Sequence, residues 1–310
     1  AHWFASHRCP ATASLLTGRV PRKKPGSRPG RPRTGQPPPY IPTLTEPRYS
    51  QSLERGFAIL GCFSSERPEL GIAEVADALG MSRPTTHRYA VTLVALGYLE
   101  QVASRKYRLG LRVADLGLAA MSSTPVADHA RPYLQQLRQQ TGCATILSVL
   151  DGEDAIVVER LREFHVPRQQ RTPEIVVGTR LALSSTATGK ALLAGQHPDV
   201  RQRLLREIPR RKAGPNAITG AKALRLDIEL TAEGDFAVDD EESGPGVQAI
   251  AAAVRDDTGD AVAALEVRAH LSRLTLSALV RAIGPRLQVT SALISGRLGY
   301  NPDRSPHPHG

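Results

Sequence analysis

The chain has 310 residues, 41% of them apolar, and a net charge of +10, which gives room for about two domains. No window approaches the roughly 18 consecutive apolar residues of a membrane span, so we expect no membrane partner. Residues 1–50 hold nine basic side chains and one acidic one, and the remaining 260 residues carry a net charge of only +2. The overall charge therefore describes the N-terminal segment and is a poor argument for a basic folded domain.

The cysteines also restrict the class of protein. Cys9, Cys62 and Cys143 are far apart and form no CxxC pair, which argues against a disulfide framework or a zinc site and fits a reducing compartment. The N-terminus lacks the apolar core of a secretory signal. We therefore expect a cytoplasmic protein with no metal and no cofactor.

Residues 1–47 are rich in Pro, Gly and Arg, with "PRKKPGSRPGRPRTGQPPPY" at their centre. Such a segment buries too little apolar surface to offset its ordering entropy, so we expect it to be disordered. Its "PGRPR" resembles the AT-hook that reads the minor groove, although a solvated basic leader is the simpler interpretation. Residues 301–310 are predicted to be a second disordered tail.

Helical patterns begin at Ser52. Leu53, Phe57 and Leu60 share one face of a predicted first helix at i, i+4 and i+7, a spacing that favours burial of that face. A second short helix covers residues 72–79 and is predicted to end at Gly80, because glycine suits the left-handed turn after a helix.

The third helix starts at Ser82, a favourable N-cap residue, with Pro84 tolerated in the first turn. Its apolar stripe lies opposite a polar front that contains Thr85, Arg88 and Thr92. Two short extended pieces, "YLEQ" and "KYRLG", then form a predicted hairpin. Three helices and a hairpin indicate a winged helix-turn-helix over residues 48–110, with the front of the third helix free to enter a major groove.

The local charge supports DNA binding where the overall charge does not. Six basic residues and one acid lie between Arg83 and Arg112, on the two elements that a winged fold places on one surface. The alternative is a merely solvated helix and hairpin.

The rest of the chain predicts a linker helix and a second domain. "LRVADLGLAAMSS" is typical of a connecting helix within residues 111–124. Residues 125–300 then alternate helices with two antiparallel strand pairs, near residues 144–161 and 247–270. Antiparallel pairs with helices before, between and after them indicate an α+β domain.

Seven stretches in order make the chain resemble a regulator of the isocitrate-lyase-regulator (IclR) family over about residues 49–299. They are "SLERGFAILGCF", "IAEVADALGMSRPTTHRYAVTLVALGYLE", "YRLGLRVADLG", "VGTRLAL", "TATGKALLA", "DFAVDDEE" and "GVQAIAAAVRDDTGDAVAALEV". The opening "RYSQSLERGFAILGCF" and "AALEVRAHLSRLTL" are most similar to the branch that controls aromatic-acid and β-ketoadipate catabolism. The resemblance implies a dimeric or tetrameric regulator with a GAF-like effector domain that binds palindromic operators.

The resemblance places the DNA contacts at the start of the third helix and in the wing: Ser82, Arg83, Thr85, Thr86, His87, Arg88, Arg105, Lys106, Tyr107 and Arg108. Arg88 suits a guanine edge, and the hydroxyls and wing cations suit phosphates. His87 is either such a contact or an ordinary surface histidine. The family usually has Ser where this chain has Pro84, so that contact is absent.

The resemblance also places an effector pocket at Ser184, Thr186, Ala187, Thr188, Asp239, Asp240, Ala249, Glu266 and Arg268. A helix start offers free amides to a carboxylate. The family tends to have small residues at the positions of Glu266 and Arg268. Period-2 geometry puts these two charged side chains on one face of their strand, where they either line the pocket or face solvent.

Asp239, Asp240, Glu241 and Glu242 raise a rival interpretation, a GAF-type ligand-sensing enzyme with an appended nucleic-acid-binding module, because clustered carboxylates hold cations or transfer protons. Four consecutive residues cannot all face one site, and no further ligand stands at metal spacing. We therefore expect no catalysis, with Asp239 or Asp240 at the pocket edge and the Glu pair in solvent. The predicted function is transcription regulation through operator DNA, modulated by a small aromatic or dicarboxylic acid.

Overall fold

The computed structural model describes residues 50–302, apart from residues 65, 123, 124, 165 and 235. The chain divides at Gly110 into two compact units, which are considered one at a time. The predicted tail 1–47 and most of the predicted tail 301–310 lie outside the described residues.

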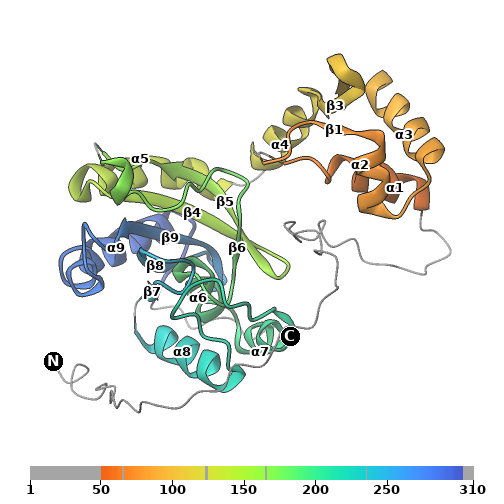
Figure 1. Ribbon diagram of the computed structural model, residues 1–310. Coiled ribbons are helices and arrows are strands. Elements are labelled where there is room, and N and C mark those ends of the chain that lie inside the picture. The colour runs from red at the N-terminus through yellow and green to blue at the C-terminus, as the bar shows by residue number, and fades with distance from the viewer. Residues whose placement is uncertain (1–49, 65, 123–124, 165, 235, 303–310) are drawn as a thin grey trace, which may run out of the picture. The chain divides into compact units, whose positions relative to one another are not determined.

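The N-terminal unit has the predicted winged helix-turn-helix architecture (Figure 1). It contains α1 (Gln51–Leu60), β1 (Leu70–Gly71), α2 (Ile72–Leu79), α3 (Arg83–Ala95), β2 (Leu99–Gln101) and β3 (Lys106–Leu109). The strands form an antiparallel sheet in the order β1-β3-β2. Gly80 ends α2 with a left-handed φ of 64°, and the Ser82 side chain caps α3 by accepting from the backbone N–H of Thr85.

The core of this unit uses a different face of α1 from the predicted one. Ile59 is buried, at 1% exposure, and Phe63 joins it in the core, whereas Leu53 and Phe57 are 65% and 62% exposed. Only Leu60 of the predicted stripe packs against that core. The prediction was wrong because both faces of α1 carry apolar residues, and spacing alone does not say which face meets the rest of the unit.

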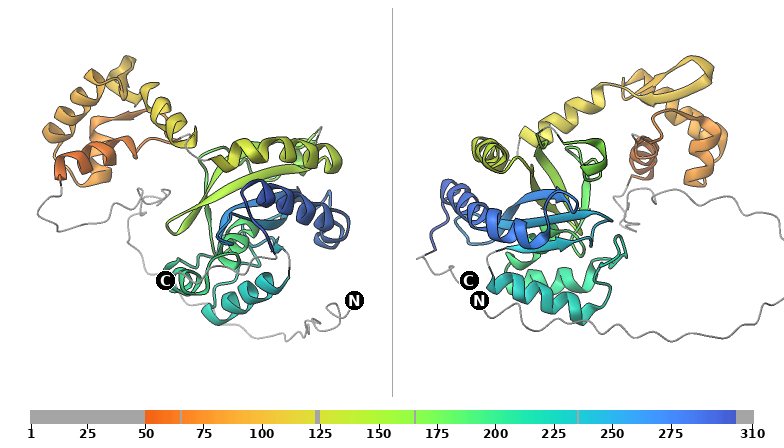
Figure 2. Two further views of the ribbon diagram at one scale, coloured as in Figure 1. Left: turned by 180° about the vertical axis from the view of Figure 1, so that it is seen from behind. Right: turned by 60° about the vertical axis from the view of Figure 1, so that its left-hand side comes forward.

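The C-terminal unit begins with two helices and continues as a mixed α/β domain (Figures 1 and 2). In chain order it contains α4 (Arg112–Ser122), α5 (Pro125–Thr141), β4 (Ala144–Asp151), β5 (Asp154–Leu161), β6 (Arg180–Ala182), α6 (Ala187–Ala194), α7 (Pro198–Glu207), α8 (Ala221–Glu233), β7 (Ala237–Asp240), β8 (Val247–Arg255), β9 (Ala261–His270) and α9 (Leu276–Arg297). The α+β class predicted from the sequence is confirmed.

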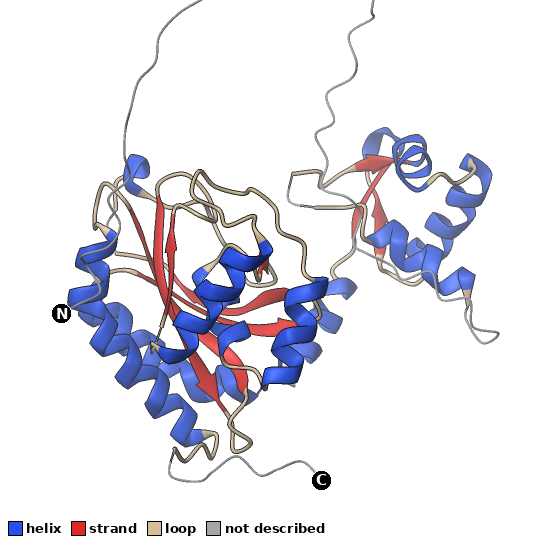
Figure 3. Ribbon diagram, turned by 90° about the horizontal axis from the view of Figure 1, so that it is seen from below, coloured by secondary structure: helices blue, strands red, loops and turns tan. Residues whose placement is uncertain are grey.

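One antiparallel sheet of six strands organises this unit, in the order β6-β5-β4-β9-β8-β7. The sequence predicted its four central strands and missed the short edge strands β6 and β7. Figure 3 shows helices on both sides of the sheet. One core lies between the sheet and α5 and α9, and the second lies between the sheet and α6, α7 and α8.

The alternation of side chains along β9 decides what each core contains. Leu265, Val267 and Ala269 belong to the core with α5 and α9. Because successive side chains of a strand point to opposite faces, Glu266 and Arg268 point to the face covered by α6. All eight residues of α6 are buried, so this face is enclosed.

Candidate functional site

The front of α3 presents most of the predicted DNA-contacting side chains. Ser82, Arg83, His87 and Arg88 are exposed, and Thr85 is half-buried. The Ser82 hydroxyl donates to Thr85 Oγ1 at 2.7 Å, which fixes the first turn of the helix. Arg83 and Arg88 therefore lie exposed in the first two turns of a capped helix, the part of a recognition helix that contacts base edges.

Two predicted DNA contacts need correction, because their side chains lie inside the unit. Thr86 is fully buried, and its hydroxyl donates to the carbonyl oxygen of Ser82 at 3.1 Å. Tyr107 is 4% exposed and packs in the core. Alternation along β3 turns Tyr107 inward between two exposed neighbours. These residues support the surface and do not present side chains to a partner.

The wing carries the remaining predicted cations. Arg105, Lys106 and Arg108 are exposed, and Ser104 and Arg105 both have positive φ at the hairpin tip. Arg108 pairs with Glu100 across the hairpin through Nε and Nη2, at 2.9 and 3.0 Å. Both side chains of this pair are about half exposed, so the pair is weak and opens at little cost. Compared with Arg108, the positive charges of Arg105 and Lys106 are less compensated by acidic neighbours.

The predicted effector residues gather on the α6 face of the sheet. Arg268 is 4% exposed and Glu266 is fully buried, and Arg268 Nε donates to Glu266 Oε1 at 2.7 Å. The other oxygen of Glu266 accepts from the hydroxyl and the backbone N–H of Thr188, at 2.5 and 3.3 Å. The charged face of β9 is thus enclosed, and Glu266 lies at the helix start that was predicted to receive a ligand carboxylate.

Asp239 lies in the same row of the sheet as Arg268. Asp239 pairs with Ala249, and Ala249 pairs with Arg268, so these three side chains share one face. Asp239 is fully buried, and its Oδ1 accepts from the backbone N–H groups of Glu242 and Ser243 at 2.8 and 3.2 Å. Burial raises the pKa of Asp239, with opposing contributions from Ser243 and Arg268.

The remaining predicted effector residues have local partners. Ser184 Oγ donates to the carbonyl of Pro209, and Thr186 Oγ1 accepts from Gly189 N and so caps α6. Ala187 is buried in the core. Asp240 faces away from Asp239, and its Oδ1 accepts from Gln248 Nε2 at 2.8 Å.

The Glu pair is not in solvent, contrary to the prediction. Glu241 is half-buried, and its Oε1 accepts from Gly246 N at 2.7 Å. Glu242 is 5% exposed, and its Oε1 lies 2.6 Å from Nζ of Lys190. The loop after β7 folds back over α6, which a four-acid run does not reveal.

Lys190 is a buried cation to which the sequence assigned no role, since "GK" without an earlier spaced glycine is not a phosphate-binding loop. Its side chain is fully buried, and Nζ also lies 3.0 Å from Asp227 Oδ2. Burial raises the pKa of Glu242 to about 7, opposed by Lys190. For Lys190, burial acts to lower the pKa, but the two carboxylates outweigh it and raise the value. A lysine inside the apolar run "GKALLA" was the available signal, because a helix that is apolar all round is buried.

Arg160 is the second residue that was missed. It pairs in register with Ile146, which in turn pairs with Glu266, so Arg160 projects onto the same α6 face. Its side chain is 10% exposed, and Nη2 lies 3.9 Å from Glu163 Oε2. Basic residues at strand ends are common in sequences, so no pattern distinguished this one.

Several polar atoms in these clusters are buried without a hydrogen-bond partner within the described part of the chain. They include Arg160 Nε, Glu163 Oε2, Asp239 Oδ2, Glu242 Oε2 and Arg268 Nη2. Buried polar groups are normally satisfied, and orphaned ones mark stored strain, an ordered water, or the position of an ion or ligand.

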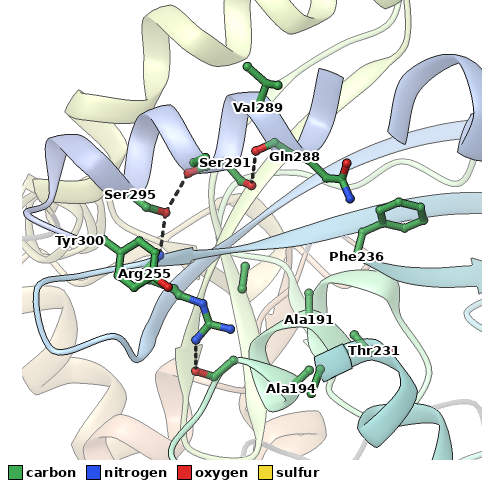
Figure 4. Close-up of a pocket in the computed structure, with 14 residues that line it drawn as sticks. Ala191, Ala194, Thr231, Phe236, Arg255, Gln288, Val289, Ser291, Ser295 and Tyr300 are labelled. Atoms are coloured by element: carbon green, nitrogen blue, oxygen red, sulfur yellow. Dashed lines mark hydrogen bonds between the residues drawn. The ribbon is translucent and has the colours of Figure 1, made fainter. Parts of the chain in front are cut away.

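A separate cavity of about 440 Å³ lies between α6, α8, β8 and α9. Figure 4 shows Arg255, Ser295 and Tyr300 at one end and Phe236 and Thr231 at the other. Arg255 Nη1 donates to the carbonyls of Gly195 and Gly259, at 3.0 and 2.7 Å. None of the predicted effector residues lines this cavity, and Arg255 there ties β8 to its neighbours.

Among the described residues, no group of three His, Cys, Asp or Glu side chains is placed to hold a metal ion. No helix of residues 50–302, outside the undescribed positions, is both long and apolar enough to cross a bilayer.

The two units together define a transcription factor that reads DNA with a winged helix-turn-helix and carries a second domain with an enclosed polar cluster. The chain belongs to the IclR family of bacterial transcriptional regulators. Residues 118–295 match "Bacterial transcriptional regulator IclR C-terminal", and residues 52–103 match the "IclR helix-turn-helix domain". The chain is therefore a DNA-binding regulator and not an enzyme.

Relatives cover most of the chain. The HTH-type transcriptional regulator BhcR of Paracoccus denitrificans (strain Pd 1222) is 33% identical over 238 residues, which are 75% of this chain and 83% of the relative. The Pca regulon regulatory protein of Pseudomonas putida is 29% identical over 246 residues, 79% of this chain and 83% of the relative. The crystal structure of an IclR homolog complexed with 4-hydroxybenzoate from Microbacterium hydrocarbonoxydans covers 80% of this chain and 98% of its own, with 24% identity and a TM-score of 0.69. This last likeness shows the fold.

Proposed function

We propose that the chain is a homo-oligomeric regulator whose operator affinity changes when its C-terminal unit binds a small aromatic or dicarboxylic acid, and that Arg268 holds the carboxylate of that acid. The observation that carries the proposal is a guanidinium that is 4% exposed with an orphaned Nη2, on the enclosed α6 face. A planar guanidinium binds a carboxylate through two parallel hydrogen bonds.

The class of acid is supported by relatives. One relative bears the name of a Pca regulon regulatory protein, and one homolog of the same fold was solved with 4-hydroxybenzoate. These names favour an aromatic or dicarboxylic acid over a small keto acid such as pyruvate.

Homo-oligomerisation is supported by apolar surface that the described residues of each unit leave uncovered. In and beside α4, Leu111, Leu116 and Leu118 are 91%, 51% and 63% exposed. Large apolar side chains left exposed in and beside a helix favour packing against another copy. In a dimer, an effector that prefers one arrangement of the paired winged units shifts the population toward it and so changes operator affinity.

A thermal-shift panel tests the effector class on wild type and on Arg268→Ala. The panel is 4-hydroxybenzoate, protocatechuate, β-ketoadipate, pyruvate and glyoxylate. We expect one of the first three to raise the melting temperature of the wild type. We expect Arg268→Ala to weaken its binding by about 1.5–3 kcal/mol, since a charged hydrogen bond is lost.

Two outcomes contradict the proposal. Stabilisation by pyruvate or glyoxylate alone refutes the class of acid. An aromatic acid that stabilises both proteins equally removes Arg268 from the site. Fluorescence anisotropy with operator DNA, with and without the acid that binds, then tests whether binding changes DNA affinity.

A further inference from the structure

The outer side of α7 and the segment after it carry a concentration of positive charge. Residues 198–212 hold 6 basic and 2 acidic side chains, a net charge of +4. The other residues of 111–302 hold 17 basic and 20 acidic side chains, a net charge of −3. Five of the cations are exposed and define what we call the basic surface: Arg203, Arg206, Arg210, Arg211 and Lys212.

The packing of α7 turns its two cations of the basic surface outward. Leu204 and Ile208 belong to the core that α6, α7 and α8 share with the sheet. Arg203 and Arg206 lie on the opposite side of the helix, where residues three apart are neighbours. Figure 1 shows α7 and α8 on the side of the unit away from α5 and α9. The cations of α7 therefore face solvent.

The segment that follows α7 is held at both ends. Ser184 Oγ donates to the carbonyl of Pro209 at 2.9 Å. Gly214 is buried against the loop after β7, where an added Cβ would overlap the carbonyl oxygen of Glu241. The three cations of residues 210–212 thus lie on a short bridge between fixed points. Ordering them on a partner costs less backbone entropy than ordering a free tail does.

The basic surface has no acidic partner within the described part of the chain, where no carboxylate oxygen lies within 4.0 Å of its charged nitrogens. Exposed arginines elsewhere in this unit do pair with acids. Arg131 lies 2.8 Å from Glu159, and Arg180 lies 2.5 Å from Asp151. Uncompensated cations on an otherwise acidic unit concentrate a positive potential at one place on it.

The composition of this surface favours nucleic acid over a protein as the partner. In residues 198–212, all of which the structure describes, no large apolar side chain is exposed. A stable protein interface needs a desolvated centre with aromatic or apolar anchors, whereas phosphate oxygens need only accessible cations. Four of the five cations are arginines, whose planar guanidinium groups suit phosphate.

We propose that the basic surface binds the phosphate backbone of double-stranded DNA, which gives the C-terminal unit a DNA contact of its own beside the base-reading contacts of the winged unit. Phosphate contacts add affinity without reading sequence. The net negative charge of the rest of the unit disfavours DNA elsewhere on it. This inference goes beyond the effector-controlled function proposed above and does not depend on the identity of the acid.

Salt titrations of the full chain on a random-sequence duplex test the inference by fluorescence anisotropy. The triple variant Arg203→Gln, Arg206→Gln, Arg210→Gln should lower the slope of log affinity against log salt concentration by about two to three, since each phosphate contact contributes about 0.9. At about 0.1 M salt it should weaken binding to the random duplex by at least about tenfold.

Two control variants separate the position of the charges from their number. The triple variant Arg281→Gln, Arg286→Gln, Arg297→Gln removes three exposed cations from α9, which covers the other face of the sheet. It should change the slope by less than about one. Lysine at positions 203, 206 and 210 should keep most of the slope, because an ammonium group also binds phosphate as a point charge.

Three outcomes overturn the inference. The first is a wild-type slope for the glutamine variant of the basic surface. The second is an equal loss of slope in the α9 variant, which would make the effect one of net charge alone. The third is a glutamine variant that binds random and operator DNA as the wild type does but no longer regulates a reconstituted promoter, which would assign the surface to a protein partner.

The same variant keeps this inference separate from the proposed function. Its melting temperature and its thermal shift with the effector should match those of the wild type, because the substituted side chains are exposed. A wild-type salt slope together with a normal effector response removes the basic surface from DNA binding and leaves the effector-controlled function standing.

Discussion

Arg88 and Lys106 are both exposed cations of the N-terminal unit, but from their places in the fold we expect different roles. Arg88 lies in the second turn of α3, the element that enters a major groove in winged helix-turn-helix proteins. Lys106 begins β3 at the wing, where a compact ammonium group suits phosphate oxygens. We therefore expect Arg88 to read sequence and Lys106 to supply affinity.

Arg88→Ala should therefore cost about 1–3 kcal/mol of specific operator affinity and relax specificity at one base pair. Lys106→Ala should weaken binding to all DNA alike, and it should reduce the slope of log affinity against log salt concentration by about one. Anisotropy titrations at several salt concentrations, with operator and random duplexes, measure both effects. Lys222→Ala, an exposed charge of α8, controls for the loss of one positive charge. If Arg88→Ala binds the operator as the wild type does, α3 is not the reading element.

At the scale of elements, α6 depends on a glycine because it packs directly on the turn that precedes it. A Cβ on Gly189 would lie 2.6 Å from the carbonyl oxygen of Ala182 and also against Cα of Leu183. Both are backbone atoms, which cannot move aside as a flexible side chain does. The close approach sets the position of Thr188, which binds Glu266.

Gly189→Ala should therefore destabilise the C-terminal unit by about 1–3 kcal/mol, the usual cost of overpacking a well-packed core. Gly296→Ala is the matched control, because Gly296 lies in α9 with no atom within 4 Å of an added Cβ. Alanine there should stabilise the helix by up to about 1 kcal/mol. Urea denaturation of the three proteins measures both changes. Equal stability of wild type and Gly189→Ala would show that α6 shifts freely on the sheet.

For the whole molecule, charge is concentrated in residues 1–47, which hold eight basic side chains and one acidic one. We expect their removal to leave folding, oligomerisation and effector response unchanged. It should mainly lower non-specific DNA affinity and its salt dependence, since each phosphate contact releases counterions. Thermal melting, light scattering and salt titrations on random DNA measure these properties. A truncated protein that aggregates or loses its cooperative melting transition would give the segment a structural role.

The sequence by itself determined the class of fold and the family, because both rest on local patterns. The Gly80–Ser82 boundary between α2 and α3 is set by a left-handed turn and a side-chain cap, and these act over a few residues. The strands of the two central pairs follow from apolar runs bounded by turns. The polar front of α3, with Thr85, Arg88 and Thr92, was likewise visible from spacing. Thr86 came from the resemblance, and its hydroxyl turns back to its own helix.

Only the tertiary structure decided which charged side chains are enclosed and which of them meet. Glu266 and Arg268 were assigned to one face from period 2, but that face turned out to be buried because α6 covers it. Arg160, Lys190 and Glu242 are far apart in the chain, and strand register and helix packing bring each to its partners. Local propensity acts over a few residues and determines where helices and strands form. The contacts between these elements join residues far apart in the chain, so the shape and charge of the site follow only from the folded chain.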